Sequence, residues 1–193
     1  MRLFIALYPT KEYLDYFRDV MRTFAKEKRN LKPINLEQIH LTLRFVGGRV
    51  SPGSKQALAK SLLQHAHQYP KPVVHMESLD FGFRHQDNPR ILLASISANH
   101  ELDKLVHMLH KQIRDLKRDD TIQWKERIDD NHHISIARLK DAATRSTGRD
   151  IKEILQGVHH PLPPDFIAHE MYLVESKLTR TGPIYQKLEK IEL

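Results

Sequence analysis

HLTLRF, residues 40–45, and HISIAR, residues 133–138, are two copies of one short pattern: histidine, aliphatic residue, small hydroxyl residue, aliphatic residue. Such alternation is typical of a β-strand with one buried face, because successive side chains of a strand point to opposite sides. The aliphatic positions predict the core side, and the histidine and hydroxyl positions predict a polar side that borders a cleft. The copies lie 133 − 40 = 93 residues apart in a chain of 193, which predicts two related halves that face each other.

The register of the second copy decides which of two adjacent histidines lies on the polar side. His133 takes the position that His40 holds in the first copy, and Ser135 and Thr42 follow two residues later. A shift by one residue moves a side chain to the other face of a strand. We therefore expect His132 to turn away from the cleft and to lie in solvent. One histidine beside a hydroxyl residue on a strand is commonly structural, whereas two matching copies indicate a functional pair.

The remainder of the chain predicts an α+β protein. Strands are expected at residues 2–8, 38–46, 73–83, 90–98, 121–128, 132–139, 166–178 and 184–192, and helices at 11–28, 51–69, 100–117 and 147–156. Several strands follow one another through short turns, which favours largely antiparallel sheets with helices on one side. No linker, charge block or low-complexity tract divides the chain, so residues 1–193 are expected to form a single domain.

The composition narrows the class of protein. The chain is 40% hydrophobic and 28% charged, which is typical of a folded globular protein. It has no cysteine, which excludes disulfides and thiolate zinc sites. We see no signal peptide and no apolar run near the ~20 residues of a membrane span, so we expect a cytoplasmic protein without a membrane partner. The net charge of +7 favours polyanionic partners.

Two opposed imidazoles are suited to acid–base chemistry at phosphorus. Histidine has an ordinary pKa of ~6.5, so one ring takes up a proton while the other gives one. The hydroxyls of Thr42 and Ser135 are able to donate hydrogen bonds to an anion between the rings. Such a displacement needs no metal or other cofactor when the leaving oxygen receives a proton. The other histidine groups, at 65–67 and 159–160, lack a nearby carboxylate at ligand spacing, so no metal site is expected.

The paired motifs occur together with FIALYP at residues 4–9 and LVESKLTRTGPIY at residues 173–185. In this combination the chain resembles the two-histidine phosphoesterase superfamily, and in particular the RNA 2′,3′-cyclic phosphodiesterases, often labelled 2′-5′ RNA ligases. The resemblance implies an α+β fold with two lobes, two mainly antiparallel sheets, outer helices and a pseudo-twofold duplication around a central cleft. It also implies that the partners are RNA ends or small cyclic-phosphate nucleotides, and we expect a monomer.

The resemblance also assigns roles to the motif residues. It implies that His40 is the proton donor and His133 the proton acceptor, with Thr42 and Ser135 holding the phosphate oxygens. Ser135 departs from the family pattern, in which threonine is more frequent at this position. Serine keeps the hydroxyl but loses the methyl group that stiffens the side chain.

Four further residues are candidates for the site. The resemblance implies that Arg138 neutralises phosphate charge and that Phe45 contacts the nucleotide. Strict alternation puts both on the core side, so either the strands bulge near their ends or these two residues do not touch the substrate. Arg44 points to the cleft under the same alternation and is a competing phosphate contact. Tyr8 closes the first predicted strand and is expected either in the core or at the border of the cleft.

Three functions remain open at this point. The first is hydrolysis of 2′,3′-cyclic phosphates at RNA ends to 2′-phosphates. The second is the same chemistry on a small cyclic nucleotide, ADP-ribose cyclic phosphate or a non-nucleotide phosphoester. The third is a non-catalytic RNA-binding module, which the intact histidine, hydroxyl and arginine positions disfavour because a binding module has no need of paired imidazoles.

Overall fold

The structure is a computed structural model that describes residues 1–193 except 28, 84–88, 117–130, 141–144 and 181. The strand expected at 121–128 lies outside the described residues. The helices are α1 (Lys11–Thr23), α2 (Pro52–Gln64), α3 (His100–Leu116) and α4 (Arg145–Gln156), with 3₁₀ turns η1 (Ala25–Glu27), η2 (Leu36–Gln38) and η3 (Ala66–Gln68). The strands are β1 (Leu3–Leu7), β2 (Leu31–Pro33), β3 (Leu41–Gly47), β4 (Val73–Val74), β5 (Met76–Phe81), β6 (Ile91–Ile96), β7 (His133–Leu139), β8 (Phe166–Ile167), β9 (Glu170–Thr179) and β10 (Gly182–Glu192).

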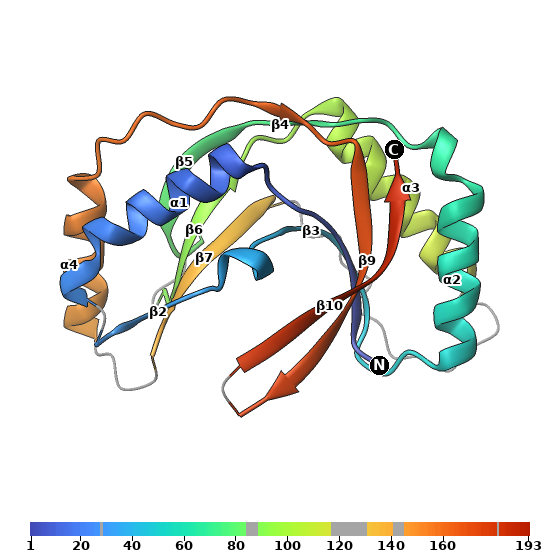
Figure 1. Cartoon of the computed structure of the whole chain (residues 1–193), viewed down its shortest axis with the longest axis horizontal. Helices are drawn as coiled ribbons and strands as arrows, with labels where there is room; N and C mark the ends of the chain where they lie inside the picture. The colour runs from blue at the N-terminus through green and yellow to red at the C-terminus, as the bar shows by residue number, and fades with distance from the viewer. Residues whose placement is uncertain (28, 84–88, 117–130, 141–144, 181) are drawn as a thin grey trace.

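One curled antiparallel sheet dominates the α+β fold (Figure 1). Its strand order is β10-β9-β1-β3-β7-β6-β5, with β2 added to β7, and β4 and β8 form a separate small sheet. The helices lie outside the curl, with α4 against β5, α3 against β3 and α2 against β10. The prediction of two main sheets is therefore wrong. Strands β3 and β7, one from each half, pair with each other through Leu41 and Ile134 at the centre of the sheet, and this pairing merges the two halves into one sheet.

The order of elements supports the predicted duplication. Along the chain, the elements β1-α1-β3-α2-β5 are followed by β6-α3-β7-α4-β9, so β1, β3 and β5 correspond to β6, β7 and β9. In the sheet, the order on one side of the β3–β7 pair is β9-β1-β3 and on the other side β7-β6-β5, which places corresponding strands at matching positions. The last strand of each half therefore lies on the sheet of the other half. A pseudo-twofold axis consequently passes between β3 and β7, where the two histidine motifs lie.

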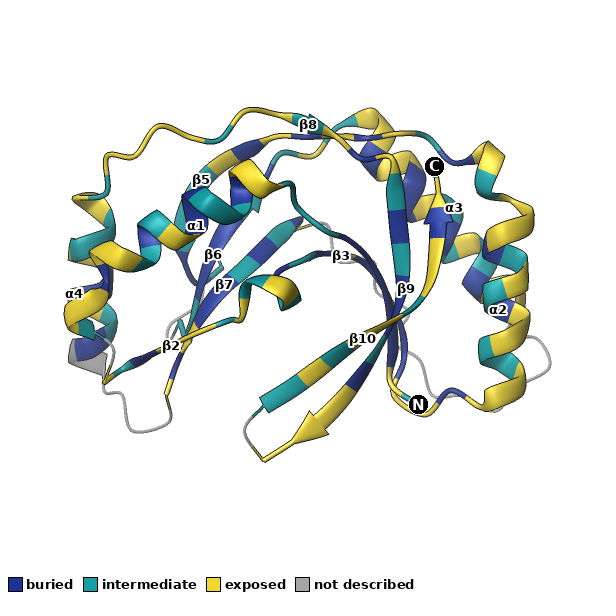
Figure 2. Cartoon of the chain, viewed as in Figure 1, coloured by how far each residue is buried: buried dark blue, intermediate teal, exposed yellow. Residues whose placement is uncertain are grey.

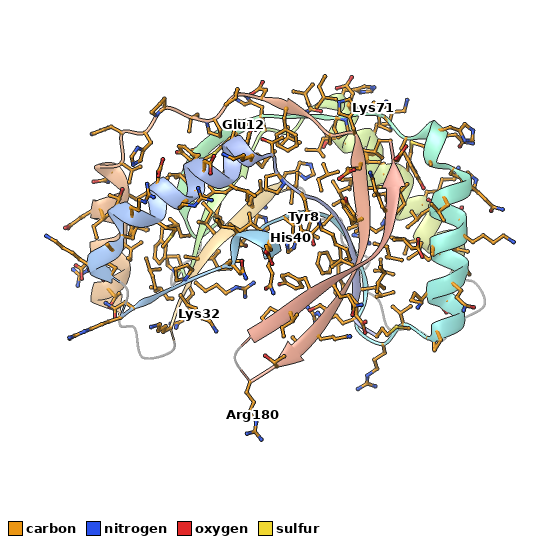
Figure 3. All side chains as sticks on the ribbon, in the orientation of Figure 1. Tyr8, Glu12, Lys32, His40, Lys71 and Arg180 are labelled. Atoms are coloured by element: carbon orange, nitrogen blue, oxygen red, sulfur yellow. The ribbon has the colours of Figure 1, made fainter. Side chains whose placement is uncertain are left out.

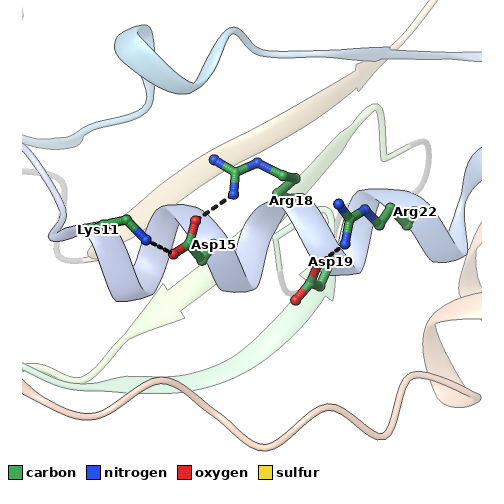
Figure 4. A network of polar contacts seen from close by, with 5 residues as sticks. All are labelled: Lys11, Asp15, Arg18, Asp19 and Arg22. Atoms are coloured by element: carbon green, nitrogen blue, oxygen red, sulfur yellow. Dashed lines mark hydrogen bonds and ion pairs between the residues drawn. The ribbon is translucent and has the colours of Figure 1, made fainter.

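Burial follows the amphipathic patterns of the sequence (Figure 2). All five residues of β1 are buried. Helix α1 buries Tyr13, Phe17 and Val20, which are spaced by three and four residues as one helix face requires. Exposed ion pairs on this helix contribute little to stability. They join Lys11 to Asp15, Arg18 to Asp15, and Arg22 to Asp19 (Figure 4).

The described helices include none that is long and apolar enough to cross a membrane. Large apolar side chains are nevertheless exposed toward the tip of the β9–β10 hairpin. Leu178 is 74% exposed and Ile184 is 49% exposed. The hairpin extends beyond the rest of the sheet, beside the strands that carry the motifs (Figure 1).

Candidate active site

The pairing of β3 with β7 brings the two sequence motifs together. The antiparallel register at the Leu41–Ile134 pair sets His40 across from Ser135 and Thr42 across from His133. Side chains directly opposite on neighbouring strands have Cβ atoms ~5 Å apart and share one face of the sheet. The motifs therefore lie side by side in one sheet rather than on opposed sheets.

Both histidine rings are held in the same way. His40 Nδ1 lies 2.7 Å from the carbonyl oxygen of Gln38, and His133 Nδ1 lies 2.9 Å from that of Asn131. A carbonyl only accepts hydrogen bonds, so Nδ1 is the donor in each ring. In the neutral form of each histidine, Nε2 then carries the lone pair. The carbonyl two residues earlier in the chain thus fixes the tautomer of each imidazole.

Aromatic side chains surround His40. The ring centroids of Phe4 and Tyr185 lie 4.8 Å and 4.9 Å from that of His40, and Tyr8 is 6.0 Å away. Tyr8 is partly exposed and lies next to His40 near the middle of the molecule, so it borders the site (Figure 3). The ammonium of Lys187 covers the outer side of the Tyr8 ring at 3.7 Å from its centroid.

This environment changes the acidity of His40. Burial lowers its pKa to about 4, although the hydrogen bond to the Gln38 carbonyl acts in the opposite direction. Arg138 and a protonated His133 would each lower the pKa of His40 further, because a nearby positive charge repels the imidazolium. Arg138 lines the same pocket as His40, and the register of β3 with β7 places His133 across from Thr42, two residues from His40.

Each motif strand contains a bulge just after its hydroxyl residue. Adjacent residues of β1 pair with Thr42 and Arg44, so β3 has one extra residue there. Adjacent residues of β6 pair with Ser135 and Ala137, so β7 has an extra residue at the matching position. An extra residue in one strand reverses the alternation of the side chains that follow.

The bulges decide which of the four further candidates reach the cleft. Phe45 and Arg138 line one pocket together with His40 and Thr42, as the alternative of bulged strands requires. Arg44 is only 6% exposed, and burial lowers its pKa. The expectation that Arg44 points to the cleft is therefore wrong, because the bulge turns it to the opposite face of β3.

The pocket at His40 and the pocket at His133 differ in chemistry. The His40 pocket, of about 250 Å³, combines aromatic side chains such as Phe45 and Tyr185 with the guanidinium groups of Arg2 and Arg138. Arg2 lies over the Phe45 ring, with its Cζ 4.7 Å from the centroid. The pocket at His133, of about 390 Å³, is lined by hydroxyls, carboxylates and Phe83, whose ring lies 4.8 Å from the imidazole.

A carboxylate organises the polar side of the His133 pocket. Asp80 accepts hydrogen bonds from the hydroxyls of Ser78 and Ser95, each at 2.6 Å. Ser95 pairs with His133 across the β6–β7 ladder. In the part of the chain that the structure describes, no group of three histidine, cysteine, aspartate or glutamate side chains is placed to hold a metal ion.

His132 is not in solvent, contrary to expectation. Its side chain is 5% exposed, and Nε2 lies 3.2 Å from Asp103 Oδ1 on α3. Helix α3 covers the outer side of the sheet and encloses the ring. His132 is thus a packed residue that turns toward the helix, while His133 lies beside Phe83.

Sequence reasoning missed several residues of the site. Phe4 has the same parity as Ala6 and Tyr8 in FIALYP, so strand alternation alone places it on the Tyr8 face. Tyr185 and Lys187 reach His40 and Tyr8 only because the hairpin bends over the sheet. No local pattern predicts that contact.

Comparisons with known proteins agree with this geometry. No family model matches the chain. An RNA 2′,3′-cyclic phosphodiesterase from Thermus thermophilus is 27% identical over 197 residues, which cover 100% of this chain and 90% of that protein. A crystal structure of a Thermus thermophilus protein has a TM-score of 0.75 and 24% identity, and covers 100% of this chain and 98% of its own.

Escherichia coli LigT, crystallised with 3′-AMP, has a TM-score of 0.67 and 21% identity over 100% of this chain and 97% of its own. The two paired motifs, the curled sheet and the similarity along the entire chain agree with one another. The chain is a homologue of the RNA 2′,3′-cyclic phosphodiesterase or LigT family of two-histidine phosphoesterases, with a likeness that extends over all of its residues.

Proposed function

We propose that the protein hydrolyses 2′,3′-cyclic phosphates at RNA ends to 2′-phosphomonoesters, without a metal ion. The observation that carries the proposal is the matched pair His40 and His133. Each ring is anchored through Nδ1, and each has a hydroxyl residue across from it on the neighbouring strand. A phosphate bound between Thr42 and Ser135 would have an imidazole Nε2 on either side.

The reaction follows from these positions. His133 Nε2 takes a proton from water as the water oxygen attacks phosphorus. The bond between phosphorus and O3′ breaks, and His40 Nε2 gives its proton to O3′. The product carries a 3′-hydroxyl and a 2′-phosphate. Arg138 and the two hydroxyls stabilise the charge on the phosphate oxygens, which is greatest in the transition state.

The difference between the two pockets supports these roles. Phe45 and Tyr185 offer apolar ring surfaces on the His40 side, which suit a nucleobase and ribose. Asp80 and Ser95 make the His133 side polar, which suits water. The leaving ribose oxygen then lies near His40, and water enters near His133.

The low pKa of His40 adds a condition to this mechanism. Free His40 is neutral at pH 7, since its pKa is about 4. An anion beside an imidazole favours the charged form and raises its pKa. Binding of the anionic cyclic phosphate therefore causes His40 Nε2 to take up a proton from solvent, and that proton is the one later given to O3′.

The test is an incubation with an RNA oligonucleotide that ends in a 2′,3′-cyclic phosphate, in the presence of EDTA. We expect a 2′-phosphate product, identified by ³¹P NMR, and loss of the product with His133→Ala. A 3′-phosphate product contradicts the direction of the reaction. Activity that EDTA abolishes and one divalent ion restores contradicts the absence of a metal.

A second substrate class is worth testing in the same assay. LigT was crystallised with 3′-AMP, a single nucleotide. The His40 pocket, at about 250 Å³, is of a size that suits one nucleotide rather than a long chain. Nucleoside 2′,3′-cyclic phosphates are therefore the second candidate substrates. ADP-ribose cyclic phosphate is the third substrate to test in this assay.

A further inference from the structure

A second cavity adjoins the catalytic pocket on the side of the β9–β10 hairpin. This hairpin pocket has a volume of about 330 Å³ and lies between the hairpin and the segment from β2 to η2. It shares Arg138, Pro183 and Tyr185 with the His40 pocket. A ligand whose reacting end lies beside His40 is therefore separated from the hairpin pocket only by these shared side chains.

The lining of the hairpin pocket combines apolar walls with a few polar groups. Pro33, Ile34 and Ile184 form apolar surface, and Lys32 and Gln38 contribute a cation and an amide. Ligand sites of ~300–1,000 Å³ with mostly apolar walls and few polar groups are typical for small organic ligands. A nucleobase with its attached phosphate has this combination of a flat apolar ring and an anion.

Two cations stand side by side at the junction of the pockets. Lys32 on β2 pairs directly with Arg138 on β7, so both side chains lie on one face of the sheet. Gly182, at the start of β10, lies close to Lys32: a Cβ built on this glycine would be 3.6 Å from Lys32 Nζ. Consecutive phosphates of one strand would meet Arg138 first and Lys32 next.

Charge also favours a path for the nucleic acid strand through the hairpin pocket over a path through the pocket at His133. The pocket on the far side of His133 is lined by Glu77 and Asp80, whose carboxylates repel a polyanion. Lys32 and Arg180 lie instead at the edge of the molecule where the hairpin ends, with Arg180 at the hairpin tip (Figure 3). A nucleic acid strand with its 3′ end between the histidines is thus directed across the hairpin.

We propose that the hairpin pocket binds the nucleotide that precedes the terminal one, with Lys32 on the phosphodiester that links the two. The preferred substrate is then an oligonucleotide of at least two residues rather than a single cyclic nucleotide. This inference rests on the proposed function, because it places the terminal cyclic phosphate between His40 and His133.

The test compares two substrates, a dinucleotide with a terminal 2′,3′-cyclic phosphate and the corresponding nucleoside 2′,3′-cyclic phosphate. We expect a higher kcat/KM for the dinucleotide. Lys32→Ala should lower that value about tenfold, as loss of one charged hydrogen bond does, and leave the mononucleotide unaffected. The slope of log kcat/KM against log salt for the dinucleotide should become shallower by ~0.7, the value for one lost phosphate contact on a single strand.

Two further variants make the result specific. Ile184→Ala should also weaken the dinucleotide alone, through the apolar wall, while Lys71→Ala should change neither substrate because Lys71 lies far from the cleft (Figure 3). Equal effects of Lys32→Ala on both substrates, or equal kcat/KM of the unchanged protein for both, would overturn the second-nucleotide site and leave the proposed function intact. Absence of turnover with either substrate would overturn the proposed function and this inference with it.

Discussion

Replacement of His40 by asparagine should remove a pH dependence of stability that comes from this residue. The asparagine side chain also has an N–H group near the position of Nδ1, so the hydrogen bond to the Gln38 carbonyl is retained in kind. The change thus removes the titrating ring but keeps a hydrogen bond to the Gln38 carbonyl. Burial lowers the pKa of His40 from 6.5 to about 4 in the folded state.

The sign and size of the effect follow from linkage. Between pH 6.5 and 4 the unfolded chain binds a proton at this residue that the folded chain does not, so the free energy of unfolding falls as the pH falls. A difference of 6.5 − 4 = 2.5 pKa units, at about 1.36 kcal/mol per unit, corresponds to about 3 kcal/mol between pH 7.5 and pH 4. Nothing is lost above pH 6.5, and the full amount is lost only below pH 4.

Urea unfolding of both proteins at several pH values measures this difference. We expect the free energy of unfolding of the original protein to fall by about 3 kcal/mol more than that of His40→Asn on going from pH 7.5 to 4. His67→Asn, which removes an exposed histidine, is the matched control. Parallel curves for the original protein and His40→Asn would refute the argument that burial holds His40 neutral.

Three further results are expected. The leaving group of a nitrophenyl phosphodiester needs little protonation, so His40→Ala should lose less than about tenfold in rate on this substrate. His133→Ala should lose about 10²–10⁴-fold on this substrate and on cyclic phosphate. If the nitrophenyl substrate instead rescues His133→Ala, the roles of acid and base are reversed. His132→Ala should lower the free energy of unfolding by about 2 kcal/mol in urea, because it removes a buried ring and its contact with α3, yet change kcat only mildly; a loss of kcat as large as that of His133→Ala would mean that His132 takes part in the reaction. Arg138→Leu should raise KM or lower kcat at least tenfold at unchanged Tm, whereas Arg44→Leu should act mainly on Tm, and the opposite pattern would place Arg44 at the phosphate.

The sequence was sufficient for the parts of the site that depend on local alternation. The equivalence of His40 with His133 and of Thr42 with Ser135 follows from the motifs, and the helices begin close to the predicted positions. Arg44 was misplaced because a bulge depends on pairing with β1, which a single strand does not encode by its own pattern. The merging of two sheets into one likewise depends on a contact between strands that are far apart in the chain.

The residues on the hairpin show the same limit. Tyr185 follows a turn that the sequence signals well, but its contact with His40 needs the whole sheet to curl. Burial is the main cause of the lowered pKa of His40, and the aromatic rings around it, such as those of Phe4 and Tyr185, come from strands far apart in the chain. Contacts between distant segments therefore set the pKa of His40, although the motif HLTLRF alone was enough to identify His40 as a candidate.

The exchange of final strands between the halves has a consequence for the integrity of the chain. Among the described strands, β5 belongs to the first half but pairs only with β6 of the second, and β9 of the second half pairs with β1 of the first. A cut between β5 and β6 would leave one fragment with a strand that has no partner and the other with an open edge where β1 belongs. Each fragment would also carry only one of the two motif histidines, His40 or His133. Reassembly of the two fragments would restore the sheet and the acid–base pair together. The two halves of the chain thus resemble the subunits of an intertwined dimer whose symmetry axis passes through the catalytic centre.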